Sequence, residues 1–431
     1  MTLLERGGPD HDSCSLGNAG MVVPSHFVPL AAPGMVALGL SWMWNPESPF
    51  YIKPRLSWDL LNWGFKFWCA ANRAHVQRSA PLLWDLSLAS RSCFEELAAE
   101  RNNDFGLVQK GLLMLCKTGH ALVEEARNAA QARVLGLPVE VLDAKQAAAL
   151  DGGVYFPKDC HLNPAQFTAG LTGELQRLGA RFEWNAEVLG WRAGDSGIAA
   201  VCTPRGEFQA DHYVLAGGSW SPLAARELGL KLPIQAGKGY SLTLPRPRQL
   251  PSVCAIFTEA RVAVTPMGGT LRFGGTMEIA GLNEAINPRR VQGTIKAAPR
   301  YYPEFREEDF AGIQPWRGLR PCSSAKNRSS TWRCWTRSAT ADPVDPAPRA
   351  NGSGFPAWVA CRVKAPRARC IPKLSMERRL VAGFAPEPAL GPRVRLKPAA
   401  SRRSGTVGLI RRQFRLAPAR ASGASQFLGG V

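Results

Sequence analysis

The segment from Asn163 to Trp220 constrains the fold more than any other part of this 431-residue sequence. It opens with Asn163-Pro164, a strong helix start, because Asn caps a first turn and Pro suits the first helical position. We expect the helix to run to Leu178, where Gly179 provides a C-terminal stop. The residues after this stop have the character of strands.

Three strands are expected after the helix, over Arg181–Trp184, near Gly197–Thr203 and over His212–Leu215. The last of them leads into a glycine turn, Ala216-Gly217-Gly218-Ser219-Trp220. Strand, helix, strand and a glycine turn at the carboxyl end of a strand are typical of α/β sheets that bind a nucleotide. The segment therefore predicts an α/β sheet with a nucleotide-binding turn.

A second kind of sheet is indicated between residues 260 and 280. Residues 261–267 and 270–276 alternate around Gly268-Gly269, which is typical of a hairpin in an antiparallel sheet. Two kinds of sheet in one chain predict a mixed α/β (α+β) fold, with two domains woven through one another.

Six of the 13 Trp residues lie between residues 42 and 84. We interpret them as bulky packing residues of core helices. A wall that faces a bound ligand is the alternative for some of them.

The net charge of +19 points at first to a nucleic acid or an anionic membrane as partner. Residues 327–431, however, hold 17 Arg and 3 Lys against four acidic residues, so this segment alone carries +16. It also holds 11 Pro and shows no sustained apolar period, which makes it poor material for a core. A disordered nucleic-acid-binding tail, an unusual domain and out-of-frame translation are the three interpretations. No aromatic residues alternate regularly with the Arg residues, so we expect no nucleic-acid partner.

The eleven Cys residues are scattered and form no CxxC pair, so neither a zinc site nor a redox dithiol is indicated. Reduced thiols favour a cytoplasmic protein. The first residues do not have the pattern of a signal peptide. The most apolar stretch, residues 28–44, contains two Pro and falls short of the roughly 20 residues of a membrane helix.

Several motifs match one known family in its own order along residues 1–323. They are Thr2–Arg6, Ser15–Gly20, Ala31–Gly34, Val154–Pro157, the Asn163 helix through Val188, Tyr213–Ser221, Lys238–Leu242, Arg272–Glu278 and Gly318–Pro321. Each motif is weak alone, but the ordered set is specific. The sequence resembles the FAD-dependent D-amino-acid dehydrogenases, within the larger D-amino-acid oxidase and glycine oxidase group of flavoproteins.

The resemblance implies a domain organisation. An FAD-binding, Rossmann-like domain is expected from residues 1–40 and 151–232. An antiparallel-sheet substrate domain is expected from residues 41–150 and 233–323, and residues 324–431 form a basic, disordered or out-of-frame tail.

The resemblance also implies the residues that contact FAD. Glu5, at the end of the second strand of such folds, would accept hydrogen bonds from the adenosine ribose, beside Arg6. Small residues would let the loop Ser15–Met21 approach the flavin, and we take Ser15, Asn18, Ala19, Gly20 and Met21 as its contacts. Val188 would meet the adenine, and Gly217 and Trp220 would form the second nucleotide-contacting turn. Without the resemblance, Glu5 would be a surface carboxylate and Val188 a packing residue.

Arg320 matches the Arg that binds the substrate carboxylate in this family. A guanidinium suits that task, because its planar fork binds a carboxylate through two hydrogen bonds and stays protonated. Tyr240 matches a strand near the flavin and is our second candidate for the substrate pocket. A half-buried strand Tyr is the alternative for it.

The implied reaction is oxidative deamination of a D-amino acid by hydride transfer from Cα to the flavin, which yields a 2-oxo acid and ammonia. A membrane quinone or another carrier is the expected electron acceptor, and a quinone would place this cytoplasmic protein at the inner face of the cell membrane. Two other functions stay open: a flavin oxidase of glycine, sarcosine or hydroxyproline, and nucleic-acid binding through the Arg-rich tail.

The sequence departs from the family at two places. The family opens with a strand and a G-x-G-x-x-G turn that holds the FAD pyrophosphate, and this βα unit of roughly 30 residues is expected upstream of Met1 or lost. The resemblance also ends near Ser324, where the charge rises. Out-of-frame translation after this residue is our interpretation. Because both missing pieces bind FAD, we expect weak flavin binding and a chain of doubtful activity.

Overall fold

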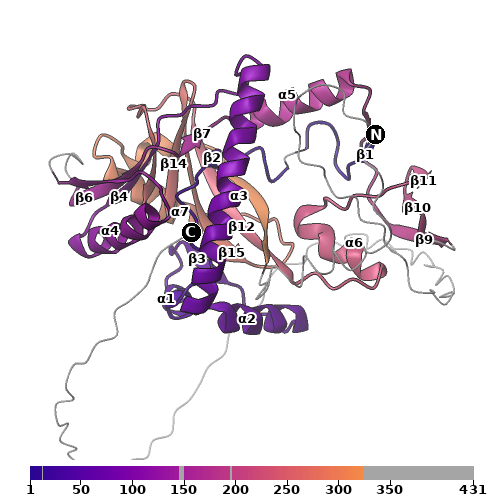
Figure 1. The fold of residues 1–431 in the computed structure, drawn as a ribbon, viewed down its shortest axis with the longest axis horizontal. Helices are drawn as coiled ribbons and strands as arrows, with labels where there is room; N and C mark the ends of the chain where they lie inside the picture. Colours follow the sequence, from indigo (N-terminus) through magenta and orange to yellow (C-terminus); the bar gives the residue numbers. More distant parts are fainter. Residues whose placement is uncertain (12, 145–149, 195–196, 324–431) are drawn as a thin grey trace, which may run out of the picture. The chain divides into compact units, whose positions relative to one another are not determined.

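The computed structural model describes residues 1–11, 13–144, 150–194 and 197–323. The expectations for residues 324–431 fall outside this described part. The described residues form a mixed α/β fold, which confirms the predicted fold class (Figure 1).

The largest sheet in the described part has nine strands. Its order is β16 (Trp316–Ser323), β12 (Ile234–Leu244), β15 (Thr270–Ile279), β14 (Val262–Met267), β13 (Cys254–Phe257), β4 (Leu112–Cys116), β6 (Gly152–Phe156) and β5 (Glu140–Asp143), with β3 (Phe50–Ile52) pairing with β15. Most neighbours are antiparallel, whereas β13 with β4 and β15 with β3 are parallel. The predicted hairpin around Gly268-Gly269 is confirmed as β14 and β15.

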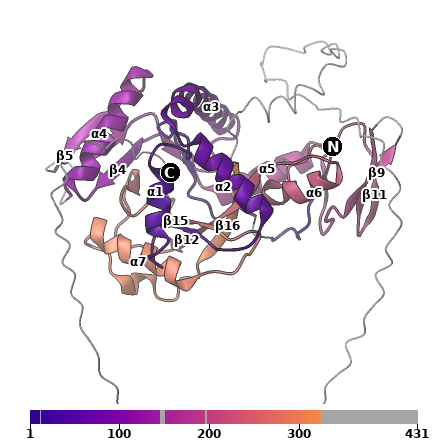
Figure 2. The same ribbon diagram turned by 90° about the horizontal axis from the view of Figure 1, so that it is seen from below.

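Helix α7 (Pro288–Tyr301) covers one face of this sheet, beside β12 and β15 (Figures 1 and 2). Asn287 caps it, because its side chain accepts a hydrogen bond from the Arg289 backbone, and Pro288 occupies the first position. The core between them is aromatic: the rings of Phe257 and Tyr301 stack with centroids 4.2 Å apart. This packing fixes the strands that carry the site.

Smaller sheets lie around this framework. Strands β1 (Thr2–Leu4) and β8 (Arg181–Glu183) are parallel, β2 (Met21–Val22) pairs with β7 (Cys160–His161), and β9 (Gly190–Gly194), β10 (Gly197–Thr203) and β11 (Gly206–Phe208) form an antiparallel trio. The predicted helix after Asn163 is confirmed as α5 (Pro164–Arg177), capped by the Asn163 side chain. The expected strand His212–Leu215 is wrong. No described strand pairs with it, and the Tyr213 hydroxyl anchors the segment by donating to the Ala199 carbonyl.

Three helices follow the first loops, α1 (Met35–Trp42), α2 (Trp58–Ala70) and α3 (Arg73–Glu100), and α4 (Gly119–Val134) lies beyond β4. The prediction that the Trp cluster lies in the core is right for Trp63, which is buried and donates to the Cys322 carbonyl at 3.0 Å. It is wrong for Trp44, Trp58 and Trp68, which are exposed. Trp44 and Trp58 remain at the surface, whereas Trp42, Trp63 and Trp68 line a cavity, which is the alternative given for part of this cluster.

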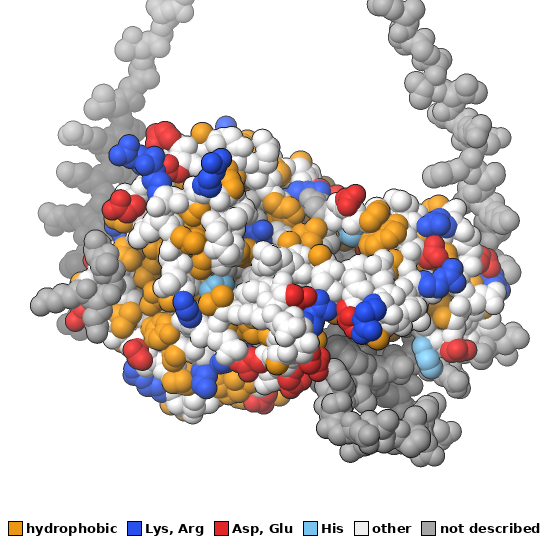
Figure 3. All heavy atoms as spheres, turned by 90° about the horizontal axis from the view of Figure 1, so that it is seen from above, with side chains coloured by type: hydrophobic (Ala, Val, Ile, Leu, Met, Phe, Trp, Pro, Cys, Tyr) orange, Lys and Arg blue, Asp and Glu red, His pale blue; other side chains and the backbone are white. Residues whose placement is uncertain are grey.

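The exposed charges of the described part are of both signs. Figure 3 shows Lys and Arg side chains interspersed with Asp and Glu over one face, without a large basic patch there. No helix in the described ranges combines the length and the hydropathy needed to cross a bilayer. The division into an FAD-binding and a substrate domain stays a prediction.

Candidate functional site

A cavity of about 2070 Å³ lies between the large sheet and other segments of the described chain. Pockets for small ligands usually measure about 300–1000 Å³, so this cavity has room for a large cofactor together with a substrate. Its walls come from the N-terminal segment, α1, α2, residues 208–224, β12, β15 and β16. All the site residues predicted from the sequence line it: Glu5, Arg6, Ser15, Asn18, Ala19, Gly20, Met21, Val188, Gly217, Trp220, Tyr240 and Arg320.

The loop of residues 15–20, which we call the cofactor loop, presents its backbone to this cavity. The N–H groups of Gly17, Asn18 and Ala19 have no hydrogen-bond acceptor in the described part of the chain. Asn18 instead uses its side chain to accept from the Gly20 N–H at 2.7 Å, which tightens the turn. Three free donors in succession suit an electronegative ligand edge.

Gly20 ends this loop in a conformation that few other residues adopt. Its φ is +65°, and a Cβ at this position would lie 2.2 Å from the Leu162 carbonyl oxygen. The Gly20 carbonyl accepts from the Leu162 N–H at 2.8 Å, just before β2 begins at Met21. The close approach of two backbones therefore requires glycine here.

Glu5 follows β1 and lines the cavity, and hydrogen bonding fixes the position of its carboxylate. Its Oε1 accepts from the Gly7 N–H at 2.9 Å, and its Oε2 lies 3.6 Å from Nε2 of His11. Val188 lines the cavity beyond β8. A fixed carboxylate acceptor suits the hydroxyl groups of a ribose.

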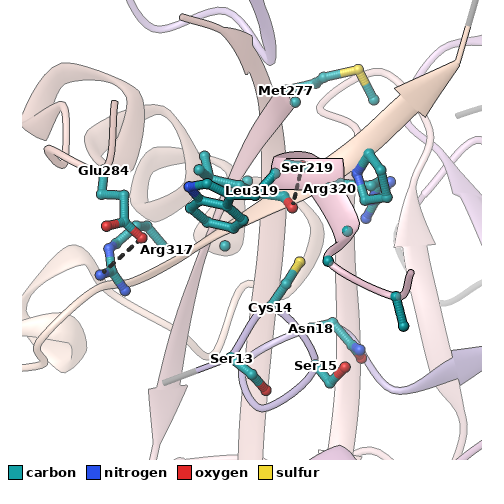
Figure 4. Close-up of a pocket in the computed structure, with 18 of the residues that line it drawn as sticks. Ser13, Cys14, Ser15, Asn18, Ser219, Met277, Glu284, Arg317, Leu319 and Arg320 are labelled. Carbon is teal, nitrogen blue, oxygen red and sulfur yellow. Dashed lines mark hydrogen bonds and ion pairs between the residues drawn. The ribbon is translucent and has the colours of Figure 1, made fainter. Parts of the chain in front are cut away.

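Arg6 lies flat against an aromatic ring at the glycine turn. Its guanidinium carbon is 3.6 Å from the Trp220 ring centroid, an arrangement that favours cation–π attraction. Gly217 precedes the short helix Gly218–Trp220, and Ser219 in that helix donates to the Leu319 carbonyl at 2.9 Å (Figure 4). This bond ties the glycine turn to β16.

Residues 316–321 of strand β16 line the cavity, and Trp316, Gly318 and Arg320 share one face of the strand because alternate residues face the same way. The Trp316 indole covers two glycines: a Cβ at Gly17 or at Gly318 would lie 2.0 or 2.2 Å from its ring atoms. Its Nε1 is buried and has no partner in the described part. Sequence reasoning missed Trp316, although its period-two spacing from Arg320 was a usable signal.

The Arg320 side chain is exposed to the cavity, where Figure 4 shows it with Leu319 across from Ser13, Cys14, Ser15 and Asn18 of the N-terminal segment. Within the described ranges it has no carboxylate partner. Glu284, a second residue without a sequence signal, instead lies 3.5 Å from Arg317 and 3.9 Å from Arg6. Arg320 is therefore a cation available to a ligand.

Tyr240 borders the cavity, but its side chain is directed to the other side of β12. Its hydroxyl donates to Oε2 of Glu278 at 2.7 Å and accepts from the Asn287 N–H at 3.2 Å, and the residue is buried. Burial, reinforced by the Glu278 hydrogen bond, raises the pKa of this phenol. This is the half-buried alternative weighed from the sequence, and a contact with substrate is not supported by the position of the hydroxyl.

A polar group at His26 forms another part of the wall that sequence reasoning missed. The Ser25 hydroxyl donates to the buried Asp159 carboxylate and lies 3.0 Å from Nδ1 of His26. Burial, together with the nearby Arg261 charge, lowers the pKa of His26 to about 4. Burial also raises the pKa of Asp159 to about 7, against the opposing effect of the Ser25 hydrogen bonds. His26 is thus neutral at physiological pH.

The family model described as FAD dependent oxidoreductase, DAO, matches residues 1–332. The chain belongs to this family. The curated relatives of this DAO-family chain include the D-amino acid dehydrogenase of Paramagnetospirillum magneticum, 32% identical over 74% of this chain and 79% of the relative. The D-amino acid dehydrogenase of Granulibacter bethesdensis is 30% identical over 73% of this chain and 78% of the relative.

Solved structures show the same fold for this DAO-family chain. The glycine oxidase from Geobacillus kaustophilus has a TM-score of 0.57 at 22% identity and covers 75% of this chain and 76% of its own. The L-alpha-glycerophosphate oxidase from Mycoplasma pneumoniae, solved with FAD bound, has a TM-score of 0.54 at 12% identity over 75% and 77%. FAD is the cofactor of the family and of this chain.

The cavity of this DAO-family chain fits that cofactor by its chemistry. The N–H groups of residues 17–19, which have no acceptor within the described ranges, suit the carbonyls and ring nitrogens of a flavin. The Glu5 carboxylate suits ribose hydroxyls, and the turn at Gly217 suits the nucleotide. These residues would hold FAD between the sheet and the N-terminal segment.

Proposed function

We propose that this chain oxidises a D-amino acid, or a similar small amine, to a 2-oxo acid and ammonia. The family supports an FAD-dependent oxidoreductase, and relatives named D-amino acid dehydrogenase support the amino-acid substrate. The observation that carries the proposal is the cavity-facing Arg320, which has no anionic partner in the described residues. A substrate α-carboxylate supplies that partner.

Arg320 would bind the carboxylate through its guanidinium fork and so fix Cα in one place. When bound, FAD would supply the acceptor for a hydride, which carries both electrons of the Cα–H bond. The substrate nitrogen loses its extra proton to solvent or to a wall group, and its lone pair forms the C=N bond as the hydride leaves. Water then adds to the imine carbon, and ammonia departs to give the 2-oxo acid.

The chain's own residues orient the substrate and exclude water from it, and none of them acts as a nucleophile. Trp316, Met277 and Phe50 line the cavity and exclude water near the reacting carbon. Low local polarity strengthens the Arg320–carboxylate pair. No covalent enzyme intermediate is needed for this chemistry.

The decisive experiment replaces Arg320 with Met and with Lys and measures dye reduction on a panel of D-amino acids, L-amino acids, glycine and sarcosine. Loss of a charged pair of this kind costs about 2–5 kcal/mol, so kcat/KM should fall roughly 30-fold or more for Arg320→Met. Arg320→Lys should recover part of the loss. Arg248→Met is the control, because Arg248 pairs with Asp309 and does not line the cavity.

The outcome that contradicts the proposal is unchanged kcat/KM in Arg320→Met, or no turnover of any substrate on the panel by a wild-type chain that contains FAD. Flavin content is measured first, from the visible absorbance of the purified full chain. A stoichiometric yellow protein would overturn the expectation of weak flavin binding drawn from the sequence. Oxygen uptake in the same assays separates a dehydrogenase, which prefers a quinone or dye, from an oxidase.

A further inference from the structure

Side chains from two strands of the large sheet, β12 and β15, donate hydrogen bonds to three successive backbone carbonyl groups of the cofactor loop. Nη1 of Arg272 donates to the Leu16 carbonyl at 3.0 Å and to the Asn18 carbonyl at 2.8 Å. Oγ of Ser241 donates to the Gly17 carbonyl between them at 2.7 Å. Arg272 is fixed in turn by Thr243, its cross-strand neighbour, whose Oγ1 accepts from Nε at 2.9 Å.

This arrangement determines where the loop amides point. In a trans peptide the C=O and N–H bonds are antiparallel. When the carbonyls of residues 16, 17 and 18 point into the sheet, the N–H groups of residues 17, 18 and 19 must point away from it. Those three residues line the cavity, and their N–H groups are the ones without an acceptor in the described part.

Arg272 also brings a charge to the loop. It makes no ion pair with any carboxylate in the described ranges, and burial alone lowers its pKa, without an opposing acidic neighbour. The charge sits at the carbonyl ends of the peptides, so the positive ends of the peptide dipoles face the cavity. Cation and dipoles therefore favour negative charge on the cavity side of the loop.

We propose that Arg272 is a positioning residue for the cofactor: with Ser241 it turns three loop amides toward the cavity, and its charge, acting through them, favours the reduced over the oxidised flavin. The proposal rests on the FAD site of the proposed function but not on the identity of the amine substrate. Reduction adds negative charge to a flavin, so the loop binds the reduced form more tightly.

The test compares Arg272→Gln, Arg272→Lys and Ser241→Ala in the full chain. Two quantities are measured for each: the Kd for FAD, from flavin fluorescence during titration of the apoprotein, and the flavin midpoint potential, from equilibration with a reference dye. Arg272→Gln should lower the affinity for reduced relative to oxidised FAD at least tenfold, which equals a fall of about 30 mV in the potential of this two-electron couple.

Arg272→Lys keeps the charge but loses the Nε bond to Thr243 that fixes the side chain under the loop. It should restore most of the potential while the Kd for FAD stays severalfold weaker. Ser241→Ala removes one anchor without a change of charge, so it should weaken FAD binding severalfold and leave the potential in place. Arg248→Gln, away from the cavity, should change neither quantity.

Two results would overturn the proposal. One is a potential unchanged in Arg272→Gln, which would leave Arg272 a structural residue only, and the other is an equal shift in Ser241→Ala, which would remove the charge as the cause. If Arg272→Gln does not fold, Arg272→Met is measured in its place, with the same expected fall in potential. A wild-type chain that takes up no FAD overturns this proposal and the proposed function together. A chain that binds FAD but oxidises no amino acid overturns only the latter.

Discussion

The two sides of strand β12 are built from different kinds of residue. On the cavity side, Gly239 and Ser241 leave space and offer backbone or one hydroxyl. On the side of α7, Lys238, Tyr240 and Leu242 are large and buried. The difference shows that the open side has little side-chain packing of its own. Its shape depends on what holds the strand from behind.

What holds it is a buried polar group. Nζ of Lys238 donates to the Ala285 carbonyl at 2.6 Å and lies 3.8 Å from Oε1 of Glu278, whose other oxygen accepts from Tyr240. These contacts join β12 and β15 to the segment that leads into α7. Glu284, in that same segment, reaches Arg317 and Arg6 at the cavity. The two sides of the strand are thus connected through residues 284–287.

The largest expected effect comes from Glu278→Ala, which leaves the Lys238 ammonium buried without its carboxylate. Removing one partner of a buried ion pair typically costs about 3–5 kcal/mol. The free energy of unfolding, from urea denaturation, should fall by about that amount. The double variant Lys238→Met/Glu278→Met is the control and should recover much of the loss. A loss below about 1 kcal/mol for Glu278→Ala would contradict the supporting role given to this pair.

The open side is tested by Gly17→Ala. The new Cβ would lie 2.0 Å from the Trp316 ring, so the indole must move within the cavity. Overpacking of this kind lowers the free energy of unfolding by about 1–3 kcal/mol. The flavin content of the purified protein should be the more strongly affected of the two. Absorbance of the purified protein and thermal unfolding measure the two effects. Gly274→Ala is a matched control, because its Cβ would lie 3.7 Å from that of Ala19, an ordinary contact.

Tyr240→Phe tests whether the tyrosine hydroxyl stabilises the α7 side of β12 or contacts the substrate. The variant loses the hydroxyl between Glu278 and Asn287, so the free energy of unfolding should fall by about 1–3 kcal/mol. KM for the amino acid should stay within about twofold, since the hydroxyl faces α7. Steady-state kinetics and urea denaturation are the measurements. A raised KM with unchanged stability would return Tyr240 to the substrate pocket, as first expected from the sequence.

The sequence predicted those parts of the molecule that local chemistry determines. The Asn163 cap, the hairpin at Gly268-Gly269 and the mixed α/β fold follow from capping, turn geometry and alternation, which neighbouring residues specify. The placement of Tyr240 could not be predicted in this way. The alternating pattern of residues predicts that a strand has two opposite faces, but it does not say which face is buried. Helix α7 and Glu278, which are distant in the sequence, bury the face that carries Tyr240.

The same limit applies to the site. Arg320 and the loop residues could be named from motifs, and they lie around one cavity. Arg272 stood inside a motif whose function the sequence does not reveal, because its two carbonyl partners are more than 250 residues away in the chain. Contacts of this length come from the assembled sheet alone. The strand predicted over His212–Leu215 is wrong for a related reason. A strand requires a partner strand, and the sequence pattern of one segment does not show whether a partner is present.

The smallest effect is expected for Asn287→Ala. This variant separates the cap of α7 from the hydrogen bond that Asn287 makes to Tyr240. Its side chain caps α7 at Arg289, whereas its backbone N–H donates to Tyr240 and survives the substitution. Loss of a cap costs about 1 kcal/mol, so urea denaturation should show that loss with flavin content and KM unchanged. Combined with Tyr240→Phe, the two losses should deviate from a simple sum, because Asn287 and Tyr240 are hydrogen-bonded to each other. A loss of flavin in Asn287→Ala would mean that the start of α7 itself, and not only the polar group behind β12, shapes the cavity.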